Sequence, residues 1–144
     1  MIIRKATKKD LKSIAEIFRI ESVKPPYNKK RTPEKALNRI KEDFRGNDIY
    51  VASVNNKIAG FIMVSVDSGI KSQLWINEIW VLKKYQGQGI GKSLMDEIEK
   101  IYKKKGIKIF ELVAHTAKGG ALDFYKRLNY HADKSMVFMQ KRMK

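Results

Sequence analysis

Three glycines at alternate positions constrain this chain more than any other stretch of its sequence. Gly87, Gly89 and Gly91 lie between an apolar run, residues 74–82, and a segment whose apolar residues recur at helical spacing. A glycine-rich turn from a strand into a helix leaves backbone N–H groups free at the helix N-terminus, where the helix dipole favours an anion. Lys92 adds a cation in the first turn. The stretch therefore predicts a binding site for a phosphate or pyrophosphate group.

The positions of these glycines exclude two common phosphate-binding loops. A Walker A loop needs a glycine separated by four residues from its Gly-Lys-Ser triplet, and Gln86 stands at that position. A dinucleotide-binding fingerprint built on Gly87 and Gly89 would need a third glycine where the chain has Lys92. The pattern that fits is Gln-x-x-Gly-x-Gly, in which Gln86 comes first and Gly91 last.

The order of the predicted elements indicates a mixed α/β (α+β) fold in a single domain over residues 1–144. Apolar periodicity, N-cap residues and glycine or proline positions predict, in chain order, a strand at 1–5, helices after Thr7 and Thr32, strands at 49–54, 58–66 and 74–82, a helix from 90, a strand at 107–113, a helix at 121–128 and a strand at 136–139. A helix that joins two strands implies a right-handed crossover and a parallel pair beside the antiparallel strands. We therefore expect a central mixed, mostly antiparallel sheet flanked by helices on both faces.

Charge and composition narrow the classes of partner and location. The formal net charge of +16, from 31 Lys+Arg against 15 Asp+Glu, favours anionic partners such as coenzyme A, nucleic acid or acidic protein. The absence of cysteine excludes disulfides and thiolate chemistry, and two histidines disfavour a histidine metal cluster, so we expect no metal. The sequence contains no signal-peptide-like apolar core and no apolar run of about 18 residues, which predicts a cytoplasmic protein without a membrane partner.

Two motifs resemble those of the GNAT superfamily of N-acetyltransferases. The glycine loop at residues 86–91 resembles the family's acyl-coenzyme A pyrophosphate loop. Residues 121–130 look like the family pattern Ala-x-x-Phe-Tyr-x-x-x-Gly-Phe, with Asn129 in place of Gly and Tyr130 in place of Phe. Asparagine is the commonest substitute for glycine in the left-handed conformation that ends a helix. The order of elements is also that of the GNAT fold over nearly the whole chain, and the resemblance implies an acetyl-CoA-dependent N-acetyltransferase.

The resemblance also implies which residues hold acetyl-CoA. In the family, backbone N–H groups of the loop bind the pyrophosphate, the end of the preceding strand pairs with the pantetheine amides, and a backbone N–H at Val81 would stabilise the oxyanion. Lys118 stands where the family often has an asparagine that contacts coenzyme A; a lysine can meet a phosphate but lacks the amide's paired donor and acceptor. The predicted cofactor-binding residues are Ile79, Trp80, Val81, Gln86, Gly87, Gln88, Gly89, Ile90, Gly91, Lys92, Lys118 and Tyr125.

Acetyl transfer by direct attack of an amine needs an acid for the leaving thiolate and a base for the amine. The second motif implies Tyr125 as the general acid, and the ordinary tyrosine pKa of about 10 is not far from that of a thiol. Glu78 is the expected base because strand alternation places it on the face of Ile76 and Trp80, and a carboxylate among apolar neighbours has a raised pKa. Glu111 is the rival, and a reaction without a dedicated side-chain base is the third alternative.

The acceptor stays open in the sequence: a small molecule, a peptide N-terminus or a protein lysine. By resemblance, residues 23–31 with Tyr27 cover the acceptor side; the other interpretation is a disordered basic loop. The charge supports a competing function, a basic nucleic-acid- or ribosome-associated module with a vestigial or regulatory acyl-CoA site. The chain carries no helix-turn-helix or RNA-reading signature, which disfavours nucleic acid as a partner. A homodimer is compatible with a domain of this size.

Overall fold

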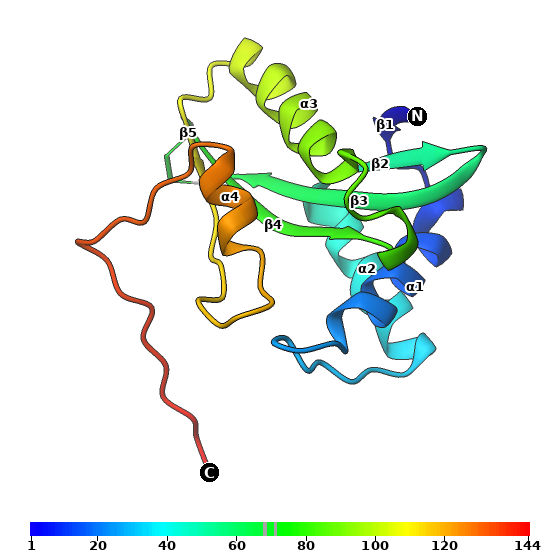
Figure 1. The fold of residues 1–144 in the computed structure, drawn as a ribbon, viewed down its shortest axis with the longest axis horizontal. Coiled ribbons are helices and arrows are strands. Elements are labelled where there is room, and N and C mark those ends of the chain that lie inside the picture. The colour runs from blue at the N-terminus through cyan, green and yellow to red at the C-terminus, as the bar shows by residue number, and fades with distance from the viewer. Residues whose placement is uncertain (68, 71) are drawn as a thin grey trace.

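The computed structural model describes residues 1–67, 69–70 and 72–144. In this part of the chain five strands form one sheet in the order β1-β2-β3-β4-β5 (Figure 1). The first four strands are mutually antiparallel, and β5 runs parallel to β4. The strands are β1 (Ile2–Lys5), β2 (Asp48–Val54), β3 (Lys57–Val66), β4 (Gln73–Val81) and β5 (Ile109–Glu111). The predicted mixed, mostly antiparallel sheet is confirmed.

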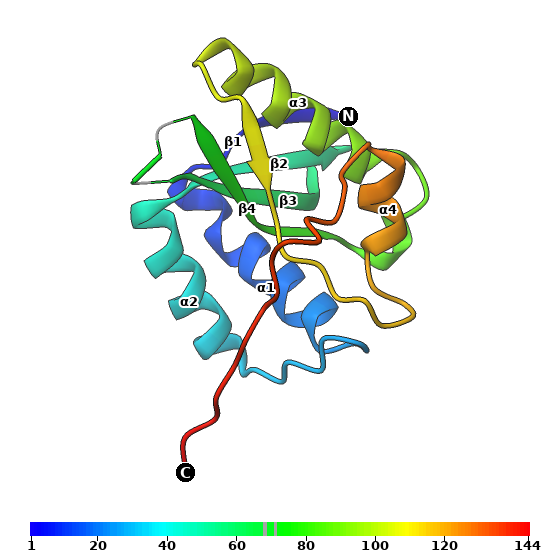
Figure 2. The same ribbon diagram turned by 90° about the vertical axis from the view of Figure 1, so that its left-hand side faces the viewer.

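Helices cover both faces of this sheet, as predicted. One apolar cluster lies between the sheet and α1 (Leu11–Ser22) with α2 (Pro33–Gly46), and the other lies between the sheet and α3 (Ile90–Lys104). The short α4 (Leu122–Arg127) packs beside α3 and joins the second cluster through Tyr125 (Figures 1 and 2). Two 3-10 turns, η1 (Lys8–Asp10) and η2 (Lys83–Tyr85), precede α1 and α3.

The first two helices begin where local capping chemistry predicts. The Thr32 hydroxyl accepts a hydrogen bond from the Lys35 N–H at 3.2 Å, and Pro33 occupies the first helical position. At the start of η1 the Thr7 N–H donates to Asp10 Oδ2 at 2.8 Å, which is one half of a capping box. These caps fix where the two helical segments begin, through residues that are only three positions apart.

Asp10 also ties β1 to the first helix, and its replacement tests that contact. Arg4 Nη1 and Nη2 donate to its carboxylate at 2.7 and 3.0 Å, and Asp10 is 6% exposed. Mainly through Arg4, these bonds hold the Asp10 pKa at about 2, below its ordinary 3.8. We expect Asp10→Asn to lower the free energy of unfolding by about 1–3 kcal/mol at neutral pH, measured by urea denaturation.

The sign of the pH dependence follows from the lowered pKa. The stabilisation from Asp10 is present above the unfolded-state pKa and is lost as the pH falls from about 4 toward about 2, where the native carboxylate takes up its proton. Glu16→Gln is the control, because its pair with Arg19 lies on an exposed helix face and should contribute less than about 0.5 kcal/mol. Equal losses for the two variants would contradict a special role for Asp10.

A β-bulge in β4 changes which residues share a face. The register between β3 and β4 shifts where Met63 and Val64 lie opposite Glu78 and Ile76. Ile76 therefore packs in the cluster under α3, whereas Trp80 joins the cluster under α1 and α2. The prediction that Glu78 shares a face with Ile76 is wrong, because simple alternation assumes that no extra residue interrupts the ladder. Glu78 lies opposite Met63, on the side of Trp80.

The predicted strand at residues 136–139 is wrong as well. No strand is formed after α4 in the described residues, and the C-terminal end of the chain projects from the body (Figure 1). A strand needs the backbone hydrogen bonds of a neighbour, which an apolar run cannot supply alone. β5 is also shorter than the predicted 107–113, because its pairing with β4 covers only three residues. None of the helices in the described ranges has the length and apolar character needed to cross a bilayer.

Candidate active site

The site begins at a stretch of strand edge that has no strand beside it in the part of the chain that the structure describes. β4 pairs with β3 up to Val81, but with β5 only over Gln73–Trp75. The Leu82 N–H donates to Ala59 on β3, so by alternation the peptide groups of Ile79 and Val81 face the open side. The carbonyl of Trp80 faces β3, close to Gly60. Free N–H and C=O groups along an extended edge can pair with an elongated ligand that carries amides.

The glycine loop follows this edge directly. Gly87 and Gly89 have φ angles of +76° and +82°, in the left-handed region that glycine adopts without cost. Gly89 is the N-cap of α3 and brings no capping side chain, so the first N–H groups of the helix lack a side-chain acceptor. A Cβ at either glycine would meet no atom of the described residues within 4 Å, so the loop surface is open. The loop thus presents bare backbone donors at the positive end of a 15-residue helix.

Side chains of the loop fix its shape. Gln86 Nε2 donates to the Val81 carbonyl at 2.7 Å, which ties the loop to the end of β4. Gln88 Nε2 donates to the Lys84 carbonyl at 3.2 Å. Lys92 Nζ lies 2.6 Å from Asp96 Oδ2 on the next turn, and its side chain is 62% exposed. The two glutamines therefore hold the backbone in place, while Lys92 keeps a solvent-facing ammonium.

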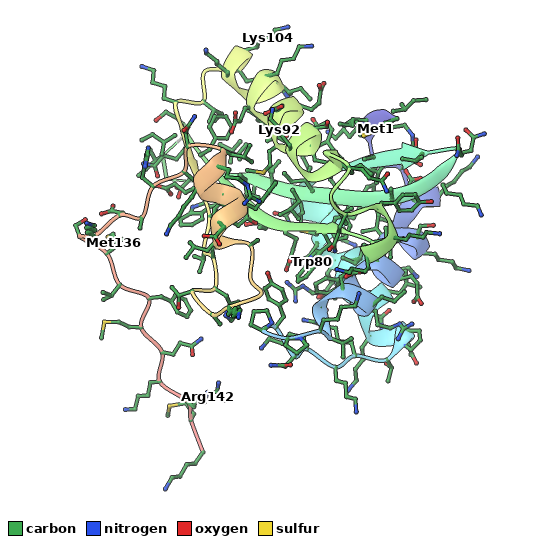
Figure 3. All side chains as sticks on the ribbon, viewed as in Figure 1. Met1, Trp80, Lys92, Lys104, Met136 and Arg142 are labelled. Atoms are coloured by element: carbon green, nitrogen blue, oxygen red, sulfur yellow. The ribbon has the colours of Figure 1, made fainter. Side chains whose placement is uncertain are left out.

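A cleft of about 1120 Å³ runs from the glycine loop along the open edge of β4 to the loop after α1. Figure 3 labels Trp80, near the end of β4, and Lys92, in the first turn of α3. The predicted site residues that line the cleft are Glu78, Ile79, Trp80, Val81, Gln86, Gly87, Gly89, Ile90, Gly91, Lys92 and Tyr125. Gln88 and Lys118 do not line it. The sequence thus predicts residues that the fold brings together from three separate elements.

Several lining residues were not predicted. Gly119 and Gly120 line the cleft in place of the neighbouring Lys118, and Lys83 and Arg127 bring cations to it. A Cβ at Gly120 would lie 3.2 Å from two carbonyl oxygens, so the chain passes too closely there for a side chain. In the sequence, the Gly-Gly pair after Lys118 is the feature that could have indicated this close approach of two backbone segments. For Lys83 and Arg127, the sequence offers no indication of a place in the cleft beyond the overall positive charge.

Tyr125 comes to the cleft from α4. Its side chain is 9% exposed and its ring lies 5.2 Å from that of Phe124 and 6.1 Å from that of Tyr130. Burial raises the pKa of Tyr125 well above the ordinary tyrosine value, and the negative charges that Tyr27 and Glu78 can carry raise it further. The phenol therefore keeps its proton throughout the neutral range.

Glu78 lies on the floor of the cleft. Its Oε2 accepts a hydrogen bond from Trp80 Nε1 at 2.6 Å, and Arg39 Nη2 lies 3.7 Å from its Oε1. Burial raises the pKa of Glu78 above its ordinary value, although the Trp80 hydrogen bond, Arg39 and Arg31 act in the opposite direction. Its rival Glu111 lies on β5 opposite Trp75 and does not line the cleft. The described ranges contain no group of three or more His, Cys, Asp or Glu side chains that could hold a metal ion.

The loop after α1 closes one end of the cleft. The Tyr27 ring meets the Trp80 ring edge to face, with centroids 4.8 Å apart, and the His115 ring at 5.2 Å. Lys24 and Pro25 line the cleft beside it. Aromatic contacts thus hold the loop against β4 and the segment after β5, and its covering of the acceptor side stays a prediction.

Comparison with known proteins identifies similar chains. A family model described as "Acetyltransferase (GNAT) family" matches residues 13–130. An uncharacterized N-acetyltransferase of Methanocaldococcus jannaschii is 32% identical over 136 residues, which cover 89% of this chain and 59% of that protein. A spermidine N(1)-acetyltransferase of Thermoplasma acidophilum is 29% identical over 146 residues, which cover 91% of this chain and 88% of that protein. The chain therefore spans about three fifths of the Methanocaldococcus relative.

Solved structures share the fold. A possible acetyltransferase from Clostridium difficile 630 matches with a TM-score of 0.83 and 23% identity, over 99% of this chain and 98% of that chain. A soil-metagenome aminoglycoside acetyltransferase in complex with sisomicin matches with a TM-score of 0.74 and 21% identity, over 99% and 96% of the two chains. At such coverage the matches extend into the C-terminal residues that project from the body.

Proposed function

Because the chain belongs to the GNAT family of acetyltransferases, we propose that it moves an acetyl group from acetyl-CoA to a primary amine by direct attack. The observation that carries the proposal is the cleft, where an unpaired strand edge, a glycine loop at a helix N-terminus and a buried tyrosine meet. An elongated thioester cofactor offers amides, a pyrophosphate and a leaving sulfur, and these three features match its parts in that order.

The cofactor would be held mainly by backbone groups. The pyrophosphate fits the N–H groups of the loop from Gly87 to Lys92, at the positive end of α3. The pantetheine amides fit the open peptide groups of Ile79 on β4, since the Val81 carbonyl already accepts from Gln86. Lys83 and Arg127 add positive charge to the lining, which favours a phosphorylated ligand.

The remaining groups divide the chemistry of the transfer. The amine nitrogen attacks the thioester carbonyl carbon, and the Val81 N–H, which faces the open edge, stabilises the negative charge on the carbonyl oxygen. Glu78 accepts the proton that the amine loses, directly or through water, because its raised pKa makes it a better base than an exposed carboxylate. As the carbon–sulfur bond breaks, Tyr125 gives its proton to the thiolate.

Replacing Glu78 by glutamine tests the base. If Glu78 accepts the proton, the wild-type rate falls as the pH drops through its raised pKa, because only the deprotonated carboxylate is active. Glu78→Gln should lower kcat/KM about 10²–10⁴-fold at neutral pH and remove that acidic limb from the pH profile. The measurement is thiol release from acetyl-CoA as a function of amine concentration, repeated over a range of pH.

Glu111→Gln is the matched control, since Glu111 lies on the neighbouring strand outside the cleft lining. Its rate should equal that of the wild type. A large loss in Glu111→Gln with an unchanged Glu78→Gln would assign the base to Glu111, and two unchanged variants would show that the reaction needs no side-chain base.

Positively charged side chains in the lining of the cleft disfavour an acceptor that carries several positive charges. Lys24, Lys83 and Arg127 line the cleft, and the carboxylate of Glu21 is already occupied by the Lys24 ammonium and the Lys83 N–H, each at 2.9 Å. We therefore propose an acceptor with a single amine, such as a peptide N-terminus, in preference to a polycation. Spermidine is the informative probe, because the Thermoplasma relative is a spermidine N(1)-acetyltransferase. A thiol-release screen over polyamines, aminoglycosides, amino acids and peptides tests this preference. A peptide or amino acid as the best acceptor would support it, and spermidine as the best acceptor would overturn it.

A further inference from the structure

Two arginines meet beside Glu78, on the face of the sheet that α1 and α2 cover (Figure 1). Arg39 lies on α2, and its Nη2 is 3.7 Å from Glu78 Oε1. Arg31 precedes α2, and its guanidinium lies 4.3 Å from the centre of the Phe18 ring, while that of Arg39 lies 5.6 Å from the same ring. Phe18 in turn meets the ring of Trp80, whose N–H donates to Glu78. The two guanidinium groups therefore lie next to the proposed base.

The arginine pair lies at the rim of the cleft. Glu78 and Trp80 line the cleft, whereas Arg31 and Arg39 do not. The side chain of Arg39 is 44% exposed, and that of Glu78 is 20% exposed. A ligand whose reacting amine lies at Glu78 and whose other end extends outward on the side of α2 would therefore reach the two guanidinium groups.

A neutral partner holds Arg31 in place. Its Nη1 donates to the hydroxyl of Ser22 at 2.9 Å, and the Ser22 carbonyl accepts from the Lys29 N–H at 2.9 Å. Ser22 is buried at the end of α1, so it fixes both the loop and the arginine. A guanidinium has several further N–H donors in a planar fork that fits a carboxylate. Within the described residues Arg31 forms no ion pair, so these donors remain available for an anion.

The proposed proton transfer changes the charge balance around this pair. Arg39 Nε donates to Asp43 at 2.9 Å, which leaves Glu78 as the carboxylate that attracts Arg31. Burial lowers the pKa of Arg31 and the charge of Arg39 lowers it further, whereas Glu78 raises it. When Glu78 accepts the proton of the amine it becomes neutral, and two cations then face the single carboxylate of Asp43. A negative charge on the acceptor would restore the balance.

We propose that Arg31 and Arg39 form an anion subsite that selects an acceptor with a carboxylate close to its amine. The inference rests on the proposed function, because it describes the acceptor end of the same cleft. The amine lies at Glu78, and the carboxylate extends past it to the two guanidinium groups. An acidic residue next to a peptide N-terminus and the α-carboxylate of a free amino acid both offer an anion that a guanidinium can bind with two hydrogen bonds.

The same pair rejects polyamines. An ammonium in the place of the carboxylate would meet two guanidinium groups, and such like-charge contacts are unfavourable. Lys29 and Lys30, which are exposed in the loop before Arg31, add to the positive potential. Salt screens these interactions, so the preference for an acceptor with a carboxylate should shrink as the salt concentration rises.

Thiol release with matched acceptors tests the subsite. Two peptides that differ only in aspartate or asparagine as the second residue report on a side-chain carboxylate, and free alanine against alanine amide reports on an α-carboxylate. In at least one pair the wild type should use the acceptor with the extra carboxylate with a kcat/KM that is about tenfold higher or more. The pair that shows this preference identifies the source of the carboxylate. Equal values in both pairs overturn the inference and leave acetyl transfer intact.

Variants separate recognition of the carboxylate from a structural role. Arg31→Gln should bring the ratio of kcat/KM within the preferred pair close to one, and Arg31→Glu should reverse it. Lys30→Gln is the matched control, because it removes the same charge from the neighbouring exposed residue, and it should keep the preference. A structural role of Arg31 would lower both members of a pair equally, so an unchanged ratio in Arg31→Gln and Arg31→Glu overturns the inference.

Calorimetric titration of the complex between the chain and coenzyme A, with the same acceptors, separates the subsite from the chemistry. The dissociation constants should show the same preference for the carboxylate. Preferential binding without thiol release from any acceptor would contradict acetyl transfer and support the subsite. Binding without preference overturns the subsite, whether or not thiol is released.

Discussion

Replacing Tyr125 by phenylalanine is expected to lower the turnover number about 10²–10⁴-fold while the affinity for acetyl-CoA stays nearly unchanged. The substitution removes the phenolic proton but keeps the ring that packs against Phe124 and Tyr130. Because burial raises the pKa of Tyr125, the wild-type side chain is fully protonated at neutral pH and ready to donate. The loss should therefore fall on the chemical step and not on binding.

Three measurements distinguish this role from a structural one. Turnover comes from thiol release, affinity from equilibrium titration with acetyl-CoA, and stability from thermal unfolding. Tyr130→Phe is the matched control, because Tyr130 is a neighbouring, half-buried tyrosine that donates a hydrogen bond to Glu99 and does not line the cleft. An acyl donor whose thiol has a lower pKa needs less protonation, so it should restore part of the Tyr125→Phe rate. Unchanged turnover with acetyl-CoA would remove Tyr125 from the role of acid.

The second large effect is expected in the glycine loop. Gly89→Ala should weaken acetyl-CoA binding about 10–100-fold, which corresponds to the loss of one or two charge-assisted hydrogen bonds from the loop. Gly89 has a φ angle of +82°, so a side chain there either strains the backbone or turns the N–H groups of the loop away from the pyrophosphate. A Cβ at Gly89 would meet no protein atom of the described residues, so a clash within the protein would not explain a loss of affinity.

Gly106→Ala separates backbone strain from loss of binding. Gly106 follows the other end of the same helix with a φ angle of +90°, and a Cβ there also meets no described atom within 4 Å. Both variants should lose about 1–2 kcal/mol of unfolding free energy from the left-handed backbone. Only Gly89→Ala should lose acetyl-CoA affinity in a calorimetric titration. Equal affinities in the two variants would contradict a phosphate cradle at residues 87–92.

Local chemistry explains which parts of the fold the sequence predicted. The caps at Thr7 and Thr32 act within three or four residues, and the helices begin there as predicted. The bulge in β4 depends on how β4 pairs with β3, and no residue type near Glu78 predicts it. Simple alternation therefore places Glu78 on the face of Ile76, which is the wrong face. The strand at residues 136–139 was predicted from its apolar run, but a strand forms only when a partner supplies the second half of its hydrogen bonds.

The site also has parts that local motifs predict and parts that depend on distant contacts. The glycine loop and Tyr125 each sit in a short motif with its own local conformation, so the sequence placed both on the lining of the cleft. The wall made by Tyr27 depends on its contacts with Trp80 and His115, which lie far away in the chain and meet only after folding. Arg127 lies on the same helix as Tyr125, but the family motif leaves its position unspecified and so did not point to it.

The central claim is that the open edge of β4 and the glycine loop form an acetyl-CoA site, and isothermal titration of the wild-type chain with acetyl-CoA tests it most directly. The titration should show one saturable site per chain, competition by free coenzyme A, and weaker binding in Gly89→Ala than in Gly106→Ala. An absence of saturable binding, or binding that Gly89→Ala leaves unchanged, would contradict it.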